Sequence, residues 1–270
     1  MSNLAIRIAA TIVGIPILLT AAMVGGSWLI LLIVMIQLAI LLEWRKFAHA
    51  AGVPLWSPAV GIAVAGLDLF VFGTHSNLMN GESIAAIYFW VLLVVFSRSR
   101  KPLLQLGYGA LFLVYVALPL SLWFSITQSG NDERFGRIGA LGVLFLSTWL
   151  CDSAAYFGGR TFGRTKLYPM ASPNKTVEGA VSGFLGSSTL LPVMSSVGAA
   201  IPNTSDFVAI PIITGIAGQI GDLIESLMKR EAGMKDSSRM IPGHGGFLDR
   251  FDSLLLSSPL FLAYLYFTTT

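Results

Sequence analysis

Charged residues are scarce in this sequence. Asp, Glu, Lys and Arg make up 11% of its 270 residues, against 54% for hydrophobic residues, whereas an ordinary soluble domain carries about 25% charged residues. Water alone cannot solvate a chain of this composition. The sequence therefore excludes an ordinary soluble domain and indicates a membrane protein.

Cysteine is almost absent as well. The single cysteine, Cys151, excludes a disulfide framework or a thiolate zinc cage within one chain, and a small core residue is the simpler interpretation of it. A Walker A loop is also missing, because the stretch 159–166 does not end in Gly-Lys-Ser/Thr. Any phosphate site must be built in another way.

Long apolar stretches recur along the whole chain. Each approaches the ~20 residues that a spanning helix needs, and their bounds are roughly 4–24, 28–43, 56–73, 83–97, 104–126, 138–157, 177–200, 207–228 and 252–267. The first is long for a signal peptide and leads directly into the second, so we expect a retained helix. The pattern predicts an all-α polytopic membrane protein with about nine transmembrane helices.

Positive charge is distributed unevenly between the two sides that nine spans create. Fifteen of the seventeen Lys and Arg residues fall at the N-terminus or in the loops after segments two, four, six and eight, and the other side holds only Arg134 and Arg137. Cytoplasmic loops carry such an excess. We therefore predict that the N-terminus is inside and the C-terminus outside.

Most polar groups fall in the second part of the chain. The stretches 158–176 and 229–252 carry nine of the seventeen Lys and Arg residues, and both lie on the predicted cytoplasmic side. We divide the protein into an N-terminal transmembrane scaffold, residues 1–102, and a C-terminal transmembrane region, residues 103–270, in which we expect catalysis and a cytoplasm-facing polar cavity.

Two aspartates interrupt apolar helices. Asp152 and Asp222 lie in otherwise apolar surroundings, where a carboxylate is costly and usually faces a bundle interior or a watery cavity; a helix end at the membrane interface is the alternative. Asp222, Glu225, Ser226 and Lys229 share one helical stripe. A structural ion pair at i,i+4 explains Glu225 and Lys229 equally well, but it does not explain Asp222.

Asp249 and Asp252 share a helical face where the last apolar segment begins. Aspartates near a helix N-terminus are favoured by the helix dipole, so capping competes with a functional role for both. Carboxylate oxygens gathered beside phosphates are also the ligands that Mg²⁺ prefers.

The stretch 226–252 is dense in groups that suit a polyphosphate. Its basic residues are Lys229, Arg230, Lys235, Arg239 and Arg250, its glycines include Gly243, Gly245 and Gly246, and its aspartates are Asp236, Asp249 and Asp252. Glycines let backbone N–H groups approach a phosphate closely. His244 suits a phosphate donor or a structural loop histidine equally. Transfer of a nucleotidyl group needs this neutralisation of charge together with a metal.

A second polar stretch precedes it. Ser172 and Thr176 can cap the helix that begins near Val177, and Lys175 beside that helix N-terminus makes a phosphate cradle. Glu178 suits a metal ligand or a complement to the helix dipole.

The motifs in these two stretches resemble those of the phosphatidate cytidylyltransferases, also called CDP-diacylglycerol synthases. Ser-x-x-Lys-Arg, Lys-Asp, Pro-Gly-His-Gly-Gly and Asp-Arg-Phe-Asp follow in the family's order between Ser226 and Asp252. Upstream, Asp152, Ala155, Tyr156, Gly158 and Gly159 precede the sequence from Ser172 to Gly179. Asn174 stands where the family usually has Lys, which puts a role for that side chain in doubt.

The resemblance implies that the phosphate of phosphatidic acid attacks the α-phosphorus of CTP and releases pyrophosphate. It implies Mg²⁺ as cofactor, with a second cation left open, and a bacterial inner membrane as location. The partners it implies are CTP, phosphatidic acid and membrane lipids, without nucleic acid, and it suggests a homodimer.

The residues to which the resemblance assigns roles fall into three sets. The catalytic residues are Asp222, Asp249, Lys175, Lys229 and Arg230. The residues that bind phosphate or CTP are Ser172, Asn174, Lys175, Thr176, Lys229, Lys235, Asp236, Arg239, His244, Gly245, Gly246 and Arg250. The metal ligands are Asp222 and Asp249, with Asp152, Glu178 and Asp252 as supporting candidates.

Two alternatives remain open on the sequence. A CTP-dependent lipid kinase of the polyprenol or phytol type resembles this family in its last helices but phosphorylates an alcohol, which needs a general base. A transporter would line a permeation path with the intramembrane aspartates. Its polar groups would be expected on both sides of the membrane midplane, whereas here they crowd one end of the helices.

Overall fold

The computed structural model describes residues 3–53, 55, 57–73, 81–97, 100–129, 132–238, 240, 241, 243 and 245–269. Its helices are α1 (Asn3–Val24), α2 (Gly26–Ala50), α3 (Ser57–Gly73), α4 (Gly81–Val95), α5 (Pro102–Phe112), α6 (Leu118–Ser129), α7 (Asp132–Phe135), α8 (Gly139–Phe162), α9 (Val177–Ser187), α10 (Leu190–Ser196), α11 (Asp206–Ile212), α12 (Gly218–Glu231) and α13 (Leu248–Thr269). The π-helical turns η2 (Leu113–Ala117) and η4 (Ile213–Ala217) join α5 to α6 and α11 to α12, and the short 3-10 turn η3 (Gly136–Ile138) precedes α8.

Helices coincide with all nine predicted apolar segments. Within the described residues, five continuous helical stretches are long and apolar enough to cross a membrane: 26–50, 102–129, 136–162, 206–231 and 248–268. Shorter apolar helices cover 11–24, 59–69 and 85–95. The prediction of a polytopic helical membrane protein is confirmed at this level.

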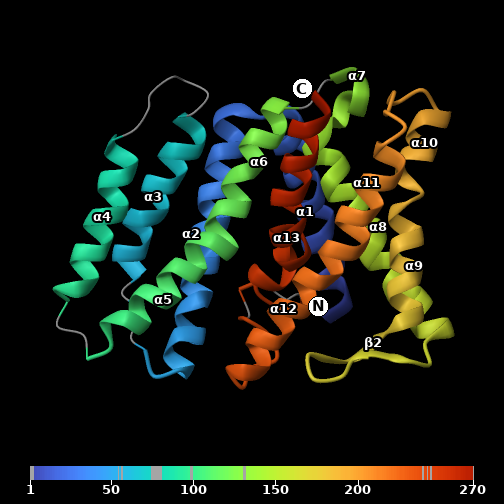
Figure 1. Cartoon of the computed structure of the whole chain (residues 1–270). Helices are drawn as coiled ribbons and strands as arrows, with labels where there is room; N and C mark the ends of the chain where they lie inside the picture. The colour runs from blue at the N-terminus through green and yellow to red at the C-terminus, as the bar shows by residue number, and fades with distance from the viewer. Residues whose placement is uncertain are drawn as a thin grey trace.

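The helices form a bundle whose two termini lie at opposite ends (Figure 1). Helices α3 and α4 stand at one side of the bundle, and α9 with α10 stands at the other. The core is aromatic at its centre: the ring of Trp123 lies 4.8 Å from that of Phe145 and 5.6 Å from that of Phe251, and Trp123 Nε1 donates to Ser258 Oγ at 2.8 Å. Large apolar side chains such as Leu103 remain exposed on the outside, where lipid is the expected solvent.

Helices α8 and α9 pack at very short range. A Cβ added to Gly183 would lie 3.0 Å from both Cys151 Sγ and Ala155 Cβ, so a side chain there would require these neighbours to shift, and glycine favours the close approach of the two membrane helices. Cys151 itself is buried, as its interpretation as a core residue predicts. The close packing fixes the polar end of α9 beside α8.

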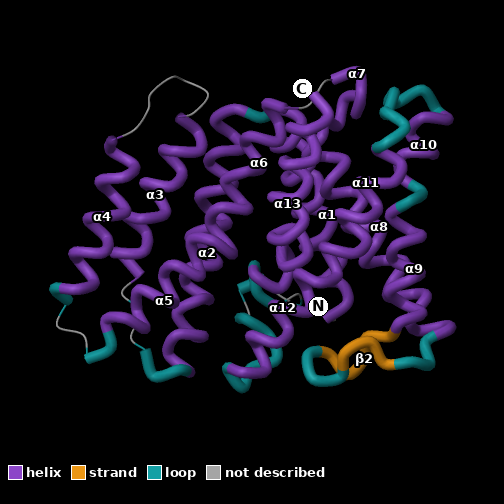
Figure 2. Tube along the Cα trace, in the orientation of Figure 1, coloured by secondary structure: helices purple, strands orange, loops and turns teal. Residues whose placement is uncertain are grey.

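A short antiparallel hairpin is the exception to the predicted all-α fold. Strands β1 (Lys166–Tyr168) and β2 (Ser172–Thr176) pair between α8 and α9 and lie at the same end of the bundle as the N-terminus (Figures 1 and 2). The prediction missed it because these strands are polar and short. The predicted cap is confirmed for Thr176, whose Oγ1 accepts the N–H of Gly179 at 3.1 Å.

A polar network is buried between α2, α3 and α6. Asp68, to which the sequence assigns no role, accepts hydrogen bonds from Gln37 Nε2 at 3.0 Å and from Ser121 Oγ at 2.5 Å. Gln37 Nε2 also donates to the carbonyl of Ala117 in η2. In an apolar environment these bonds fix the helices in one register.

An ion pair lies at the end of the bundle opposite to the hairpin. Arg134 donates to both oxygens of Asp206, from Nε at 3.0 Å and from Nη2 at 2.5 Å. Asp206 also accepts Tyr264 Oη and the N–H of Asn203, and Arg134 donates to Thr268 Oγ1. Asp206 is fully buried and Arg134 is 7% exposed. This clamp joins the segment before α8 to α11 and α13.

Candidate active site

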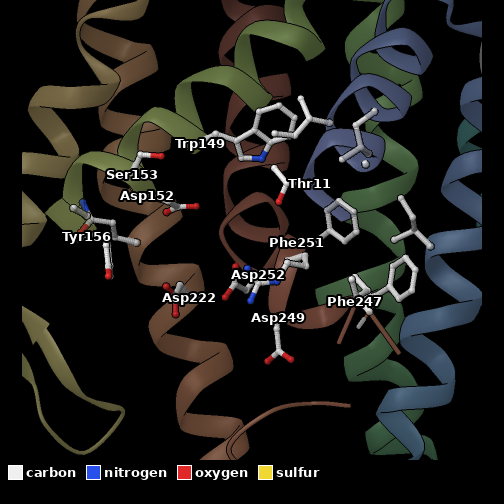
Figure 3. Close-up of a pocket in the computed structure, with 18 of the residues that line it drawn as sticks. Thr11, Trp149, Asp152, Ser153, Tyr156, Asp222, Phe247, Asp249, Phe251 and Asp252 are labelled. Carbon is white, nitrogen blue, oxygen red and sulfur yellow. The ribbon is translucent and has the colours of Figure 1, made fainter. Parts of the chain in front are cut away.

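A cavity of about 2030 Å³ opens between α1, α2, α8, α9, α12 and α13. One wall is apolar and comes from α1 and α2, including Ile17, Val24, Trp28, Leu31 and Met35. The other end is polar and comes from α8, β2, α12 and α13 (Figure 3). The cavity therefore joins an apolar surface to a charged one, as an amphiphilic substrate requires.

Three carboxylates from three different helices face this cavity. Asp152 of α8, Asp222 of α12 and Asp252 of α13 all line it (Figure 3), and they lie close enough for their charges to act on one another. Like charges gathered in a concave site attract cations. The structure thus brings together residues that are as much as 100 positions apart in the sequence.

Lys175 connects the hairpin to this acidic group. Its Nζ lies 2.5 Å from Asp222 Oδ2, and each side chain is 28% exposed. A pair this open is screened and exchangeable, so the lysine can leave the carboxylate for a phosphate oxygen. Lys175 and Asp222 were both predicted as catalytic, and the structure places them in contact.

Lys229 is shared between two acids. Its Nζ lies 2.5 Å from Glu225 Oε2 and 2.7 Å from Asp249 Oδ1. The predicted i,i+4 ion pair with Glu225 is therefore present, and it coexists with a link to the second predicted catalytic aspartate. Glu225 Oε1 is buried with no hydrogen-bond partner in the part of the chain that the structure describes.

Asp249 is oriented by the loop between α12 and α13. Its Oδ2 accepts the N–H of Gly246 at 2.7 Å, the N–H of Ser237 at 3.1 Å and Ser237 Oγ at 3.0 Å. Gly246 therefore donates its N–H to Asp249, whereas the sequence predicted that this glycine approaches a phosphate. Figure 3 shows the Asp249 carboxylate directed away from Asp252, toward the loop end of the cavity.

Glu178 lies at the N-terminus of α9 and ties the hairpin to it. Its carboxylate accepts the N–H groups of Arg164 at 3.0 Å and Thr165 at 3.1 Å. These hydrogen bonds, that from Arg164 first, lower the pKa of Glu178 from its ordinary 4.5 to about 2. The geometry gives Glu178 a structural task, and its assignment as a metal ligand stays a prediction.

The remaining predicted residues divide by position. Those that line the cavity are Asn174, Thr176, Asp236 and Arg250. Arg230 donates instead to the carbonyls of Ala171 and Met234, which connects α12 to the hairpin. Arg239 and His244 lie outside the described residues. The roles of Ser172, Lys235 and Gly245 remain predictions.

The sequence analysis missed several groups at this site. Trp149 and Ser153 on α8 and Thr11 on α1 line the cavity, together with Tyr156, which the family motif already contained (Figure 3), and Glu43 on α2 binds the loop that leads into Asp249. The helical spacing from Trp149 to Tyr156 through Asp152 was a readable sign. Glu43 could be suspected only as an acid at the end of an apolar segment.

The acidic residues suit a hard cation supplied with substrate. Among the described residues no group of three or more His, Cys, Asp or Glu side chains lies close enough to hold a metal. Mg²⁺ does not need one, because it is usually held by one or two carboxylates, with waters and substrate phosphates as its other ligands. Asp222 and Asp249, each now balanced by a lysine, fit that requirement.

Comparisons with known proteins identify the family that the chain is similar to. The profile described as "Cytidylyltransferase family" matches residues 5–268. Proteins named phosphatidate cytidylyltransferase are similar to the chain: that of Staphylococcus haemolyticus is 31% identical over 257 residues, covering 94% of this chain and 96% of that protein. That of Staphylococcus saprophyticus is 35% identical over 266 residues, 94% of each, and that of Haemophilus influenzae is 38% identical over 211 residues, 73% of this chain and 71% of that protein.

These matches confirm the resemblance that the motifs indicated. They extend it from the two polar stretches to nearly the whole length of the chain, including the helices that form the apolar wall of the cavity. The chain belongs to the cytidylyltransferase family.

Proposed function

We propose that this protein transfers CMP from CTP to phosphatidic acid, giving CDP-diacylglycerol and pyrophosphate. The observation that carries the proposal is the single cavity in which an apolar wall from α1 and α2 meets the acids and lysines of β2, α12 and α13. The acyl chains of a diacyl lipid match the apolar wall of the cavity, and its phosphate headgroup matches the polar end. The nucleotide enters from the polar end.

The lysines at this site neutralise phosphate. Lys175 is partly exposed and already lies beside Asp222, so it can bind a phosphate oxygen with little movement. Lys229 is held between Glu225 and Asp249 and presents its charge at a fixed position. Stabilisation of charge that develops on the triphosphate is the main contribution expected from such groups.

The nucleophile needs little activation. A phosphate monoester is largely ionised near neutral pH, since its second pKa is about 6, and its oxygen can attack the α-phosphorus directly. The bond from that phosphorus to the bridging oxygen of pyrophosphate then breaks, and pyrophosphate leaves with the electron pair. The protein must therefore orient and neutralise rather than abstract a proton.

Asp222 and Asp249 would hold Mg²⁺, with Asp152 and Asp252 in support. Mg²⁺ bound there would neutralise negative charge on CTP and help align its phosphates. Asp152 is exposed within the cavity, so it can reach such a cation through a water molecule.

The proposed placement in the membrane follows from charge. We take the nine helical segments as nine spans, with α9 and α10 together as one of them, and the loops that carry most Lys and Arg residues on the cytoplasmic side. The N-terminus would then be inside, the C-terminus outside and the cavity open to CTP. A homodimer is expected by resemblance to the family.

The function is tested with purified protein in detergent, given CTP, Mg²⁺ and phosphatidic acid, with a matched set of reactions that contain a polyprenol in place of phosphatidic acid. One reaction carries label in the cytidine ring and a parallel one carries label in the γ-phosphate. Transfer of CMP leaves the ring label on the lipid and the γ label in pyrophosphate, and EDTA abolishes both signals. Appearance of the γ label on the lipid would instead identify a lipid kinase, and absence of CTP turnover would overturn both.

A further inference from the structure

Glu43, near the C-terminal end of α2, is fully buried and binds a distant part of the chain. Within the described residues its carboxylate accepts four hydrogen bonds: from Ser237 Oγ at 2.9 Å, Ser238 Oγ at 2.5 Å, and the N–H groups of Phe247 and Leu248, both at 2.9 Å. A carboxylate is costly to bury, and among the described residues the donors to this one come from the loop between α12 and α13 and from the first turn of α13.

This loop also orients Asp249. Ser237 Oγ lies 2.9 Å from Glu43 Oε2 and 3.0 Å from Asp249 Oδ2, and its single hydrogen can be donated to only one of them at a time. Ser237 Oγ thus lies between the two carboxylates and can donate to either one. Its backbone N–H adds a further bond to Asp249.

Gly246 shows how tightly the three parts fit. A Cβ built on this residue would lie 2.6 Å from both oxygens of Glu43 and would overlap Ser237 Oγ. Its N–H meanwhile donates to Asp249. A side chain at position 246 would therefore clash with both Glu43 and Ser237. Glu43 lies directly against the groups that hold Asp249, so a shift of its carboxylate is expected to move them.

We propose that Glu43 is a positioning residue for the transfer reaction. It fixes Ser237 and the first turn of α13, and so keeps the Asp249 carboxylate in the orientation that binds the cation. The inference rests on the proposed function, in which Asp249 is a metal ligand. Partners that orient a metal ligand commonly change metal affinity or activity by about 10- to 100-fold when they are replaced.

The first test is the Mg²⁺ dependence of the initial rate in Glu43→Gln. The amide replaces one acceptor oxygen by an NH₂ group that faces donors, so the loop loses two of its four bonds. We expect the Mg²⁺ concentration for half-maximal rate to rise about 10-fold or more, with much of the rate recovered at high Mg²⁺. A matched control is Gln37→Leu, which removes a buried polar side chain from the same helix away from the loop. This control should lower thermal stability and leave the Mg²⁺ dependence unchanged.

A second pair of variants decides the matter even if Glu43→Gln does not fold. Ser237→Ala and Ser238→Ala each remove one donor to Glu43, but only the Ser237 hydroxyl also contacts Asp249. Ser237→Ala should therefore raise the Mg²⁺ requirement several-fold more than Ser238→Ala. Equal Mg²⁺ dependence in the two serine variants, or wild-type Mg²⁺ dependence in folded Glu43→Gln, would overturn the inference.

These outcomes are separable from failure of the proposed function. If Asp249→Asn keeps full activity, the metal assignment itself is wrong, whatever Glu43 does. If Asp249→Asn is inactive and Glu43→Gln behaves as wild type, the metal assignment stands and only the positioning role fails.

Discussion

The two ends of the helical bundle both contain ion pairs, and they differ in how completely those pairs are satisfied. At the end with the C-terminus, Asp206 is enclosed and accepts from Arg134, Tyr264 and Asn203. At the end with the hairpin, Lys175 and Asp222 are each 28% exposed, although Lys229 and Asp249 beside them are largely enclosed. A closed pair has no capacity left for a ligand and serves the fold, whereas an open pair keeps charge available for substrate.

The strongest test of this comparison is to remove a carboxylate charge at the end of the bundle with the hairpin. Asp222→Asn and Asp249→Asn should each lower kcat about 10³-fold, since each loses a proposed cation ligand and the electrostatic stabilisation of the triphosphate. Thermal unfolding in detergent should change little for the partly exposed Asp222, whereas Asp249→Asn also loses bonds to Lys229, Gly246 and Ser237 and should unfold at a lower temperature. Measured kcat together with unfolding temperature checks this, and full turnover in both variants would remove the metal assignment.

Variants at the end of the bundle with the C-terminus should lose stability and keep their activity. Arg134→Ala leaves Asp206 buried without its guanidinium, and breaking a buried pair in this way costs about 3–5 kcal/mol of unfolding free energy. Activity per folded molecule should stay near that of the wild type. Denaturant unfolding in detergent, with the turnover of the soluble fraction, measures both quantities.

The double variant Arg134→Met with Asp206→Leu sharpens the same point. Apolar replacement of both partners removes the buried charge altogether, so most of the lost stability should return. A double variant as unstable as Arg134→Ala would show that the clamp acts through more than its charge.

A smaller loss of stability is expected for changes to the buried polar network that lies between the two ends. Gln37→Leu removes the amide that donates to Asp68 and to the carbonyl of Ala117, and hydrogen bonds between membrane helices are worth about 1 kcal/mol or less. Unfolding free energy should fall by that amount. A loss as large as that of Arg134→Ala would mean that the network, rather than the clamp, sets the stability of the bundle.

The smallest expected effect concerns pH. The pKa of Glu178 is lowered to about 2, chiefly by the backbone N–H of Arg164, so its ionised form stabilises the fold. This contribution is fully present above the ordinary pKa of 4.5 and is lost as pH falls toward 2. The unfolding temperature of Glu178→Gln should therefore lie slightly below that of the wild type at pH 7, and the two should converge at low pH.

The helices could be read from the sequence because each depends on its own apolar residues. The same holds for the cap at Thr176 and the ion pair of Glu225 with Lys229, which join residues three or four positions apart. The predicted all-α class holds for the bundle, but the hairpin between α8 and α9 was not predicted, because hydrogen bonds between short polar strands, and not periodicity, produce it.

The contacts that could not be read are those between distant residues. Glu43 and its donors lie 194 to 205 positions apart, and Asp68 meets Ser121 across 53 positions. A single sequence holds no record of which buried acid meets which loop. The division at residue 102 and the metal-binding roles likewise remain predictions.

The apolar wall that α1 and α2 contribute to the cavity has a kinetic consequence. Trp28 and Leu31 line the cavity while staying largely exposed on the outside of the bundle, so a lipid can arrive sideways from the bilayer without passing through water. The enzyme and its lipid substrate then meet by diffusion within the plane of the membrane. In mixed micelles the rate should follow the mole fraction of phosphatidic acid at the surface rather than its bulk concentration, and inert detergent should slow the enzyme by dilution alone.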